Sequence, residues 1–315
     1  MSIDNLKKFL EQTYCVSCSS ITYVSQSETI LYKAESSKGN FAVKVFAPMQ
    51  GIDFDIFGEK TYTKENLEVI NELIDSIQMN KENISFDLST PIRSVLGTFS
   101  SRLSNGCLMT MSSWVEGSDL LHPMRSDSVF KQIGKCFAVF HKLATENAGN
   151  LNLQLQDRIS SLLIELKKRI KSVICTDVLR NRLKNAYQII QNSFYEHDCG
   201  NVIVVHGDAS LSNIVEYAGR FSLIDYSLCS IANPYLDLGF LSFELPSDKV
   251  VDYLISGYEE ESGMSINRDL LKVYRMFRAL LYACANLKEA ENFSWISEDP
   301  MNWVENLWNT VLFSE

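Results

Sequence analysis

A short apolar run that ends abruptly in polar residues places the strongest constraint on how this chain folds. Residues 202–205 (Val-Ile-Val-Val) are wholly apolar and β-branched, and His206-Gly207-Asp208 follows them directly. Such a run predicts a buried strand that leads into a loop. The polar side chains of this loop would therefore lie where the buried structure stops.

A hairpin is predicted after this loop. The residues between Asn213 and Asp225 contain two short apolar stretches around a turn signal at Gly219, a pattern typical of two strands joined by a tight turn. A hairpin would hold Asp208, Asn213 and Asp225 close together. Two carboxylates and one amide suit Mg²⁺, which takes oxygen ligands and keeps substrate phosphates in its shell. A carboxylate left free of metal could orient a hydroxyl and accept its proton.

The spacing of these residues resembles a known family. Residues 206–213 read H-x-D-x-x-x-x-N, an I-D pair ends at Asp225, and residues 233–239 read N-P-Y-L-D-L-G. This arrangement resembles the aminoglycoside phosphotransferase and choline kinase family, the small-molecule branch of the protein-kinase-like fold. Protein kinases carry Arg where Gly207 stands and Phe where Tyr226 stands, which favours the small-molecule branch.

The resemblance implies an α+β, bilobal protein-kinase-like fold. A small antiparallel β-sheet lobe with one helix would bind the nucleotide and span residues 1–111. Residues 112–117 would form the linker between the lobes. A larger, mainly helical lobe, residues 118–315, would carry the catalytic and acceptor-binding residues. The close match covers only residues 206–239.

The resemblance also assigns roles to individual residues. Asp208 would position and deprotonate the hydroxyl of the acceptor, while Asn213 and Asp225 would hold Mg²⁺. His206 and Asp237 would brace the loop through hydrogen bonds. Taken singly, an aspartate or asparagine here could instead simply shape a turn, because both bond readily to nearby backbone.

Lys44 is the candidate ligand of the nucleotide phosphates. It is the one cation in the alternating strand predicted at residues 41–46, and a lysine between two valines is costly to bury unless an anion meets it. The resemblance gives this lysine the α and β phosphates; a lysine that reaches out from a sheet edge is the alternative. Ser27 lies in the turn that would cover the phosphates, where the expected glycines are absent.

A glutamate on the next helix is expected to pair with Lys44. Apolar residues at helical spacing predict a helix over residues 63–78. Glu65 fits the family pattern best and Glu68 is the alternative, although a glutamate on a solvated helix face is the ordinary interpretation.

The linker is expected to hold the base of the nucleotide. Its sequence ends in the V-E-G of residues 115–117, which resembles the family. Backbone groups of Met111, Ser113 and Val115 would meet the adenine edge, since a backbone offers both a donor and an acceptor. The helices predicted near 157–173 and 178–196 would form the variable insert that shapes the acceptor pocket.

Composition limits the classes of partner and location. Among 315 residues, 39 are acidic and 29 basic, which gives a formal net charge of -10 and argues against nucleic acid, whose phosphates need a basic face. The eight cysteines show no zinc-ligand spacing and are expected to be reduced. We find neither a signal peptide nor a run of about 20 apolar residues. A cytoplasmic protein without membrane contact is expected.

These observations predict an ATP-dependent phosphotransferase that uses Mg²⁺ and moves the γ-phosphoryl group to a hydroxyl of a small molecule. The acidic balance is compatible with a cationic acceptor, such as an aminoglycoside or an amino alcohol. The alternative is a catalytically silent, kinase-like regulator that binds nucleotide, because the phosphate loop is poor in glycine.

Overall fold

A five-stranded antiparallel sheet forms the first part of the chain in the computed structural model, which describes residues 2–26, 29–46, 62–79, 86–121, 126–172, 174–197 and 202–312. The strand order is β1-β2-β3-β6-β5, with bounds Cys18–Gln26, Ile30–Ser36, Gly39–Phe46, Leu108–Ser113 and Ser100–Arg102. Alternate residues of β3 point into the core, as a half-buried strand requires. Helix α1 (Ile3–Tyr14) buries Leu6 and Leu10 in the same cluster as Val43 and Met109.

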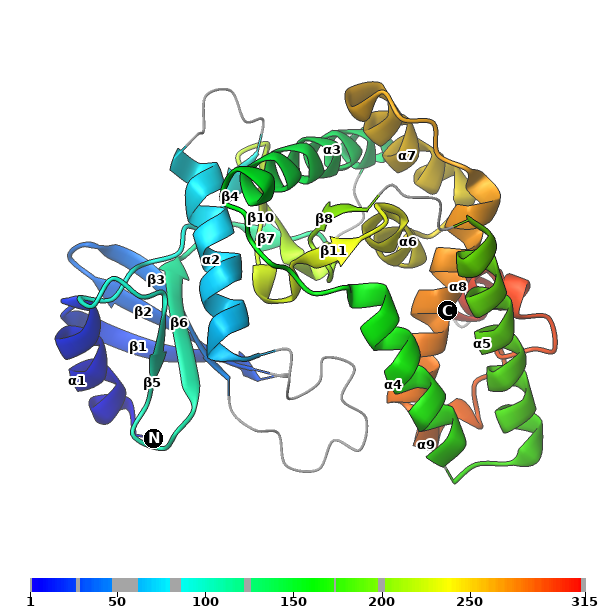
Figure 1. Ribbon diagram of the computed structural model, residues 1–315, viewed down its shortest axis with the longest axis horizontal. Coiled ribbons are helices and arrows are strands. Elements are labelled where there is room, and N and C mark those ends of the chain that lie inside the picture. The colour runs from blue at the N-terminus through cyan, green and yellow to red at the C-terminus, as the bar shows by residue number, and fades with distance from the viewer. Residues whose placement is uncertain are drawn as a thin grey trace.

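Helix α2 (Lys64–Met79) lies between this sheet and the rest of the molecule (Figure 1). The sequence predicts this helix over residues 63–78, and its observed bounds differ by one residue at each end. The prediction succeeded because the apolar residues recur on one helical face. Most of that face, including Leu73 and Ile77, belongs to the hydrophobic core of the second part of the chain. Leu67 instead packs with Phe46 and Leu108 of the sheet. The helix therefore couples the sheet to the helical region.

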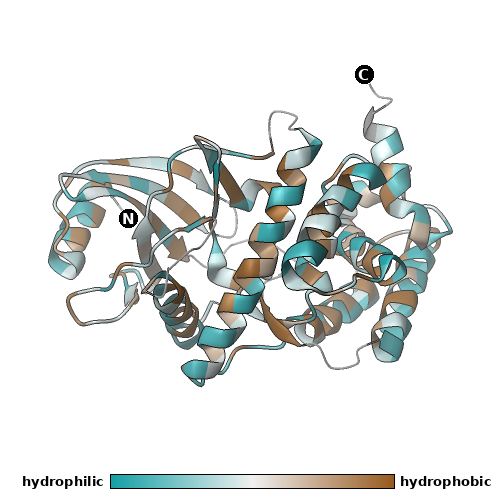
Figure 2. Cartoon of the chain, turned by 90° about the horizontal axis from the view of Figure 1, so that it is seen from above, coloured by the Kyte–Doolittle hydropathy of each residue, from teal (hydrophilic) through white to brown (hydrophobic). Residues whose placement is uncertain are grey.

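Helices dominate the second part of the chain. Their bounds are α3 Asp127–Asn150, α4 Arg158–Ser172, α5 Asp177–His197, α6 Tyr235–Phe243, α7 Asp248–Ser262, α8 Arg268–Ala285, α9 Leu287–Ala290 and α10 Trp303–Leu312. Figure 2 shows helices with a hydrophobic and a hydrophilic face, as amphipathic packing requires. Helices α3 and α7 approach closely: a Cβ on Gly257 would lie 1.9 Å from the Lys131 carbonyl oxygen.

Two small sheets carry the segment that the sequence singled out. Strands β9 (Ile214–Tyr217) and β10 (Arg220–Leu223) are antiparallel neighbours, so the predicted hairpin is confirmed. They lie between β4 (Asp87–Leu88) and β7 (Ser118–Asp119). Strand β8 (Ile203–Val205), the predicted buried strand, pairs with β11 (Ser230–Ala232). Both sheets lie between the five-stranded sheet and helices α4, α5 and α8 (Figure 1).

The segment between the two parts is tied to both of them. Strand β6 continues through Ser113, and the next residue, Trp114, donates its N–H to the Asn40 carbonyl at 2.9 Å. Glu116 accepts from Asn40 Nδ2 at 3.1 Å and pairs with Lys33 at 3.2 Å. Gly117 has φ +129°, and a Cβ there would lie 2.4 Å from the Glu216 carbonyl oxygen. A lobe boundary within residues 112–117 remains our proposal.

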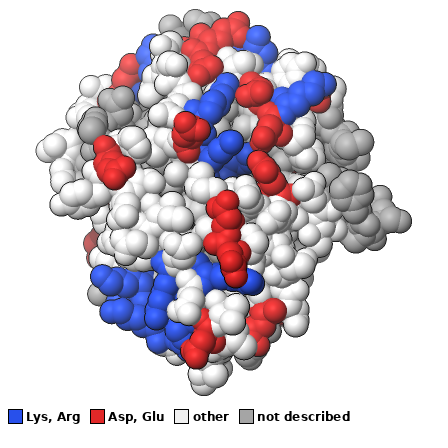
Figure 3. Space-filling view, turned by 90° about the vertical axis from the view of Figure 1, so that its right-hand side faces the viewer, with Lys and Arg blue, Asp and Glu red and all other residues white. Residues whose placement is uncertain are grey.

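The surface carries both signs of charge. On the face in Figure 3, Lys and Arg gather at the lower edge, while acidic and basic side chains intermingle above. Glu260 of α7, for example, pairs with Lys131 at 2.8 Å and Lys135 at 3.1 Å of α3. Within the described part of the chain, no helix combines the length and apolar character needed to cross a bilayer.

Candidate active site

The loop after β8 is fixed by one fully buried carboxylate, that of Asp237 on α6. Its Oδ2 accepts the His206 N–H at 2.6 Å, and its Oδ1 accepts the Gly207 N–H at 2.9 Å. His141 Nε2 lies 2.9 Å from Oδ2, and Nδ1 lies 3.0 Å from the Tyr258 hydroxyl. A carboxylate can only accept, so Nε2 is the ring nitrogen that donates to Asp237. The predicted bracing by His206 and Asp237 is therefore confirmed.

Gly207 explains why this loop reads H-G-D. Its φ is +81°, in the left-handed region that side chains rarely adopt, and a Cβ would lie 2.0 Å from the Leu228 carbonyl oxygen. His206 also links this loop to the segment that contains Leu228, because its Nε2 donates to the Ile224 carbonyl at 2.9 Å. The loop of residues 206–213 thus packs directly against the segment that carries Asp225.

Asp208 and Asn213 lie together at the end of this loop. Asn213 Nδ2 donates to the Asp208 carbonyl oxygen at 2.9 Å and to its Oδ2 at 3.1 Å. The Ile224 N–H donates to the Asn213 carbonyl at 3.0 Å, which places Asn213 beside the residue before Asp225. The structure therefore brings together the three residues predicted as catalytic base and metal ligands.

Asp225 is joined to Lys44 of the N-terminal sheet by an ion pair between Oδ2 and Nζ. Ser227 donates its hydroxyl to the other oxygen, Oδ1, at 2.6 Å. Burial by itself would raise the pKa of the Asp225 carboxyl, but the Lys44 ammonium and the Ser227 hydroxyl outweigh it and lower the pKa to about 2. Asp225 is therefore an anion at neutral pH, in a left-handed backbone conformation with φ 62°.

The two candidate glutamates of α2 lie in different surroundings. Glu65 is exposed in the first turn of the helix. Glu68 accepts the backbone N–H groups of Phe99 and Ser100 at 2.9 and 2.7 Å and the Ser100 hydroxyl at 2.5 Å. Glu68 thus anchors α2 to the sheet, and Lys44 pairs with Asp225. The pairing of Lys44 with Glu65 stays a prediction, and Ser27 lies outside the described residues.

The predicted adenine-binding backbone is partly engaged within the protein. The Met111 carbonyl accepts the Ile92 N–H at 2.8 Å, and the Ser113 N–H donates to the Thr90 carbonyl at 2.8 Å. The Met111 carbonyl and the Ser113 N–H therefore point toward residues 90–92. Val115 lies beyond the end of β6, where the chain leaves the sheet. Contacts of all three residues with a nucleotide base stay predictions.

The donors present fit a hard cation held partly by phosphates. Asn213 uses its amide nitrogen on Asp208, which leaves its side-chain carbonyl oxygen available as a ligand. Asp225 adds an ionised carboxylate. Across the described residues, no group of three or more His, Cys, Asp and Glu side chains is placed to hold a metal without help. Mg²⁺ commonly takes one or two carboxylates and completes its shell with phosphates and water.

Two further side chains approach Asp208 that the sequence did not indicate. Arg278 of α8 places Nη2 3.8 Å from Asp208 Oδ1. Glu244, just after α6, accepts the Leu211 N–H at 2.6 Å. Burial raises the pKa of Glu244, although the Leu211 N–H and the Arg278 charge act against that rise. Both residues come from helices distant in sequence and stand in no recognisable motif.

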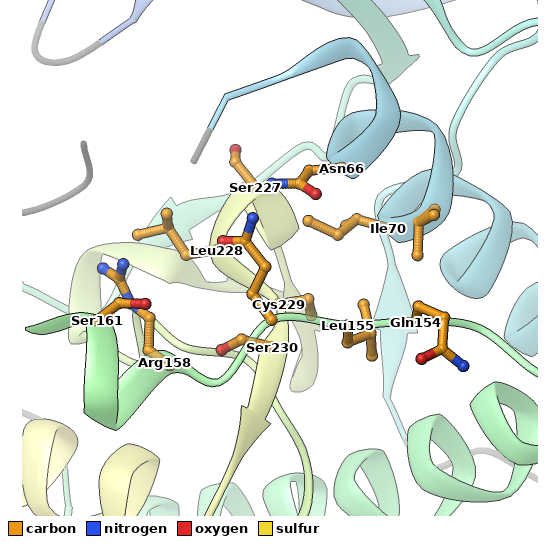
Figure 4. Close-up of a pocket in the computed structure, with 12 residues that line it drawn as sticks. Asn66, Ile70, Gln154, Leu155, Arg158, Ser161, Ser227, Leu228, Cys229 and Ser230 are labelled. Atoms are coloured by element: carbon orange, nitrogen blue, oxygen red, sulfur yellow. The ribbon is translucent and has the colours of Figure 1, made fainter. Parts of the chain in front are cut away.

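A shallow hollow lies between α2 and the start of α4 (Figure 4). Ser227 lines it and also donates to Asp225. In the described part of the chain its lining includes neither Asp208 nor Asn213. The other lining residues are Asn66, Val69, Ile70, Gln154, Leu155, Gln156, Arg158, Ser161, Leu228, Cys229 and Ser230. The hollow therefore borders the cluster but is not its centre.

Comparison with solved structures identifies the fold. The chain is similar to an amicoumacin kinase in complex with AMP-PNP, Ca²⁺ and Ami, with TM-score 0.72, 11% identity, and 98% of this chain and 94% of that one covered. It is similar to a spectinomycin phosphotransferase in complex with ADP and spectinomycin, with TM-score 0.67, 13% identity and 99% of both chains covered. A choline/ethanolamine kinase family protein from Mesorhizobium loti gives TM-score 0.61, 14% identity, and coverage of 99% and 94%.

The chain thus has the protein-kinase-like fold of small-molecule phosphotransferases, and the predicted α+β class is confirmed. The resemblance stated from residues 206–239 is confirmed at the level of fold. The sequence matches no family model and no curated protein.

Proposed function

We propose that this protein is a kinase that transfers the γ-phosphoryl group of ATP to a hydroxyl group of a small molecule. The observation that carries the proposal is the meeting of Lys44, from the N-terminal sheet, with Asp225, beside Asp208 and Asn213. The N-terminal sheet supplies a cation that can bind phosphates. The second part of the chain supplies carboxylates that can bind a metal ion and accept a proton. Neighbouring structures with this fold hold AMP-PNP or ADP, which supports a nucleoside triphosphate as donor.

Asp208 is the proposed general base. Its carboxylate accepts the proton of the acceptor hydroxyl while the acceptor oxygen bonds to the γ-phosphorus; the bond from that phosphorus to the β–γ bridging oxygen breaks, and ADP leaves. Asn213 fixes Asp208 through Oδ2, so the base is positioned before substrate binds. Positioning of this kind supplies much of the rate in phosphoryl transfer, because the loose transition state needs little covalent assistance.

The remaining proposed roles concern the nucleotide. Asn213 and Asp225 would hold Mg²⁺, which shields the phosphate charge when it is bound. Lys44 would bind the α and β phosphates, with Glu65 as its partner on α2. Ser27 and the backbone of Met111, Ser113 and Val115 complete the proposed nucleotide site. A cytoplasmic location is part of the proposal, since the described cysteines are free and ATP is supplied there.

Release of ADP by the full chain with Mg²⁺ and ATP, with and without candidate acceptors, tests this proposal. We expect at least one hydroxyl compound to stimulate release, and Asp208→Asn to reduce the stimulated rate about 10²- to 10⁴-fold, the range of general-base catalysis. Nucleotide affinity should change little, because Asp208 faces the acceptor. Ser212→Ala, an exposed change in the same loop, is the matched control. Equal rates in wild type and Asp208→Asn would refute the assignment.

A further inference from the structure

The two oxygens of the Asp208 carboxylate face different parts of the molecule. Oδ2 is held by Asn213, on the side of the proposed metal and phosphates. Oδ1 faces Arg278 of α8, whose Nη2 lies 3.8 Å away. Helix α8 packs against α4, α5 and α6 in the helical region, far from the N-terminal sheet (Figure 1). The Oδ1 side is therefore the direction from which an acceptor would reach the base.

Arg278 is held in place but keeps its hydrogen-bonding capacity. Its Cζ lies 4.8 Å from the ring centroid of Phe240, which fixes the guanidinium plane. The 3.8 Å separation from Asp208 exceeds hydrogen-bond length. Over the residues that the structure describes, the guanidinium donates no hydrogen bond to a protein acceptor. The side chains of Arg278 and Asp208 are 21% and 22% exposed, so a ligand can reach both.

The surroundings of Arg278 suit a small, partly apolar ligand. The nearby carboxylate of Glu244 is committed to the Leu211 N–H. The Phe240 ring lies under the guanidinium, with its centroid 4.8 Å from Cζ. An aromatic face therefore borders the Arg278 cation on one side. A planar guanidinium of this kind matches the two oxygens of a carboxylate or phosphate.

We propose that the acceptor is a small hydroxy acid whose anionic group binds Arg278 while its hydroxyl meets Asp208. The inference rests on the proposed kinase function and narrows its substrate class. With the two protein groups 3.8 Å apart, the hydroxyl and the acid group of the acceptor lie only a few bonds apart. A group placed directly against the guanidinium is attracted to it if it is anionic and repelled if it is cationic.

Matched acceptors test the proposed charge. ADP release is measured with glycerate, with glycerol 3-phosphate, with neutral glycerol and with cationic ethanolamine, and then with longer hydroxy acids and their amides. We expect acids to exceed their neutral and cationic counterparts at least about tenfold in kcat/KM, as one charge-assisted contact allows. The carboxylate and phosphate arms decide which anion is preferred. Stimulation confined to neutral or cationic acceptors would overturn the proposal.

Variants of Arg278 separate acceptor recognition from positioning of the base. Arg278→Gln should raise the KM for the acid about 10- to 100-fold and leave the KM for ATP within about twofold, while Arg278→Lys recovers part of the loss. Lys272→Gln removes the same charge from an exposed site on α8 and is the matched control. If Arg278→Gln instead lowered kcat equally for acidic and neutral acceptors, Arg278 would only orient Asp208 and the proposal would be wrong.

A binding measurement distinguishes failure of this inference from failure of the proposed function. Thermal unfolding is followed with ADP and Mg²⁺, with and without each hydroxy acid. We expect a rise in Tm with ADP in both wild type and Arg278→Gln, and a further rise with the acid in wild type alone. No rise with ADP would count against the kinase itself. A rise with ADP, with acids having the same effect on both proteins, would overturn only the acceptor class.

Discussion

The loop of residues 206–213 and the contact between the N-terminal sheet and Asp225 are held by different kinds of interaction. In the loop, the buried Asp237 accepts from two backbone N–H groups and from His141, all within the helical region. Between the sheet and the helical region, Lys44 forms an ion pair with Asp225, and Glu68 accepts the Ser100 N–H. The loop geometry is therefore set inside one region. The contact between Lys44 and Asp225 depends on how closely the two parts of the chain approach each other.

The largest effect should come from removing the carboxylate that holds the loop. Asp237→Ala leaves three buried donors without an acceptor, and each such donor then carries its full desolvation cost. We expect the free energy of unfolding to fall by about 3 to 5 kcal/mol, measured by urea unfolding. Asp252→Ala on α7, whose exposed carboxylate pairs with Arg268 at 3.5 Å, should cost less than about 1 kcal/mol. Similar losses in the two variants would contradict a loop held by Asp237.

A pair of glycines tests how tightly the loop of residues 206–213 packs against the segment around Leu228. Gly207 and Gly219 have nearly the same φ, +81° and +78°, but a Cβ meets the Leu228 carbonyl oxygen at 2.0 Å only at Gly207. Gly219→Ala should cost about 1 kcal/mol for its backbone conformation. Gly207→Ala should cost about 3 kcal/mol or more and abolish turnover, because the loop must move. Chemical unfolding and ADP release measure the two effects, and equal costs would show that the loop can yield.

The difference between these two regions also explains how far the sequence could be interpreted. The spacing from His206 to Asp237 predicted the loop, the hairpin and the bracing contacts, because residues close in sequence are fixed by local strands and turns. The fold class followed from the same motif, and solved structures confirm it. His141, a buried residue of α3 that lies outside the motif, contacts Asp237 and so helps to hold the loop of residues 206–213.

Contacts between elements that are distant in the sequence could not be predicted from it. Arg278 and Glu244 reach Asp208 and its loop only because α6 and α8 pack together, and no spacing within either helix reveals that. The choice between Glu65 and Glu68 depends likewise on where α2 meets the sheet. Glu65 and Glu68 are three positions apart, which is less than one helical turn. A small rotation of α2 therefore decides which of them faces the sheet, and in the structure Glu68 contacts Ser100. Such contacts are set by packing of whole elements.

The smallest expected effect concerns the ion pair between Lys44 and Asp225, which joins the two regions. The pKa of Asp225 is about 2 in the folded protein, against an ordinary value of 3.8, so the unfolded chain binds the proton more tightly. The stability that Asp225 contributes is then complete above about pH 4 and is lost as the pH falls toward 2. After allowance for solvent screening, wild type should lose on the order of 1 kcal/mol more than Asp225→Asn between pH 5 and pH 2.

Lys44→Met sharpens this last test, because it removes the main cause of the lowered pKa of Asp225 and leaves burial, which acts in the opposite direction. The single variant Lys44→Met is compared with the double variant that carries both Lys44→Met and Asp225→Asn, by urea unfolding at pH 5 and at pH 2. We expect the acid-dependent difference in unfolding free energy between these two proteins to shrink or change sign relative to the difference between wild type and Asp225→Asn. An undiminished difference would mean that the two regions are not joined through Lys44, and Asp225 would then be held by contacts as local as those of the loop of residues 206–213.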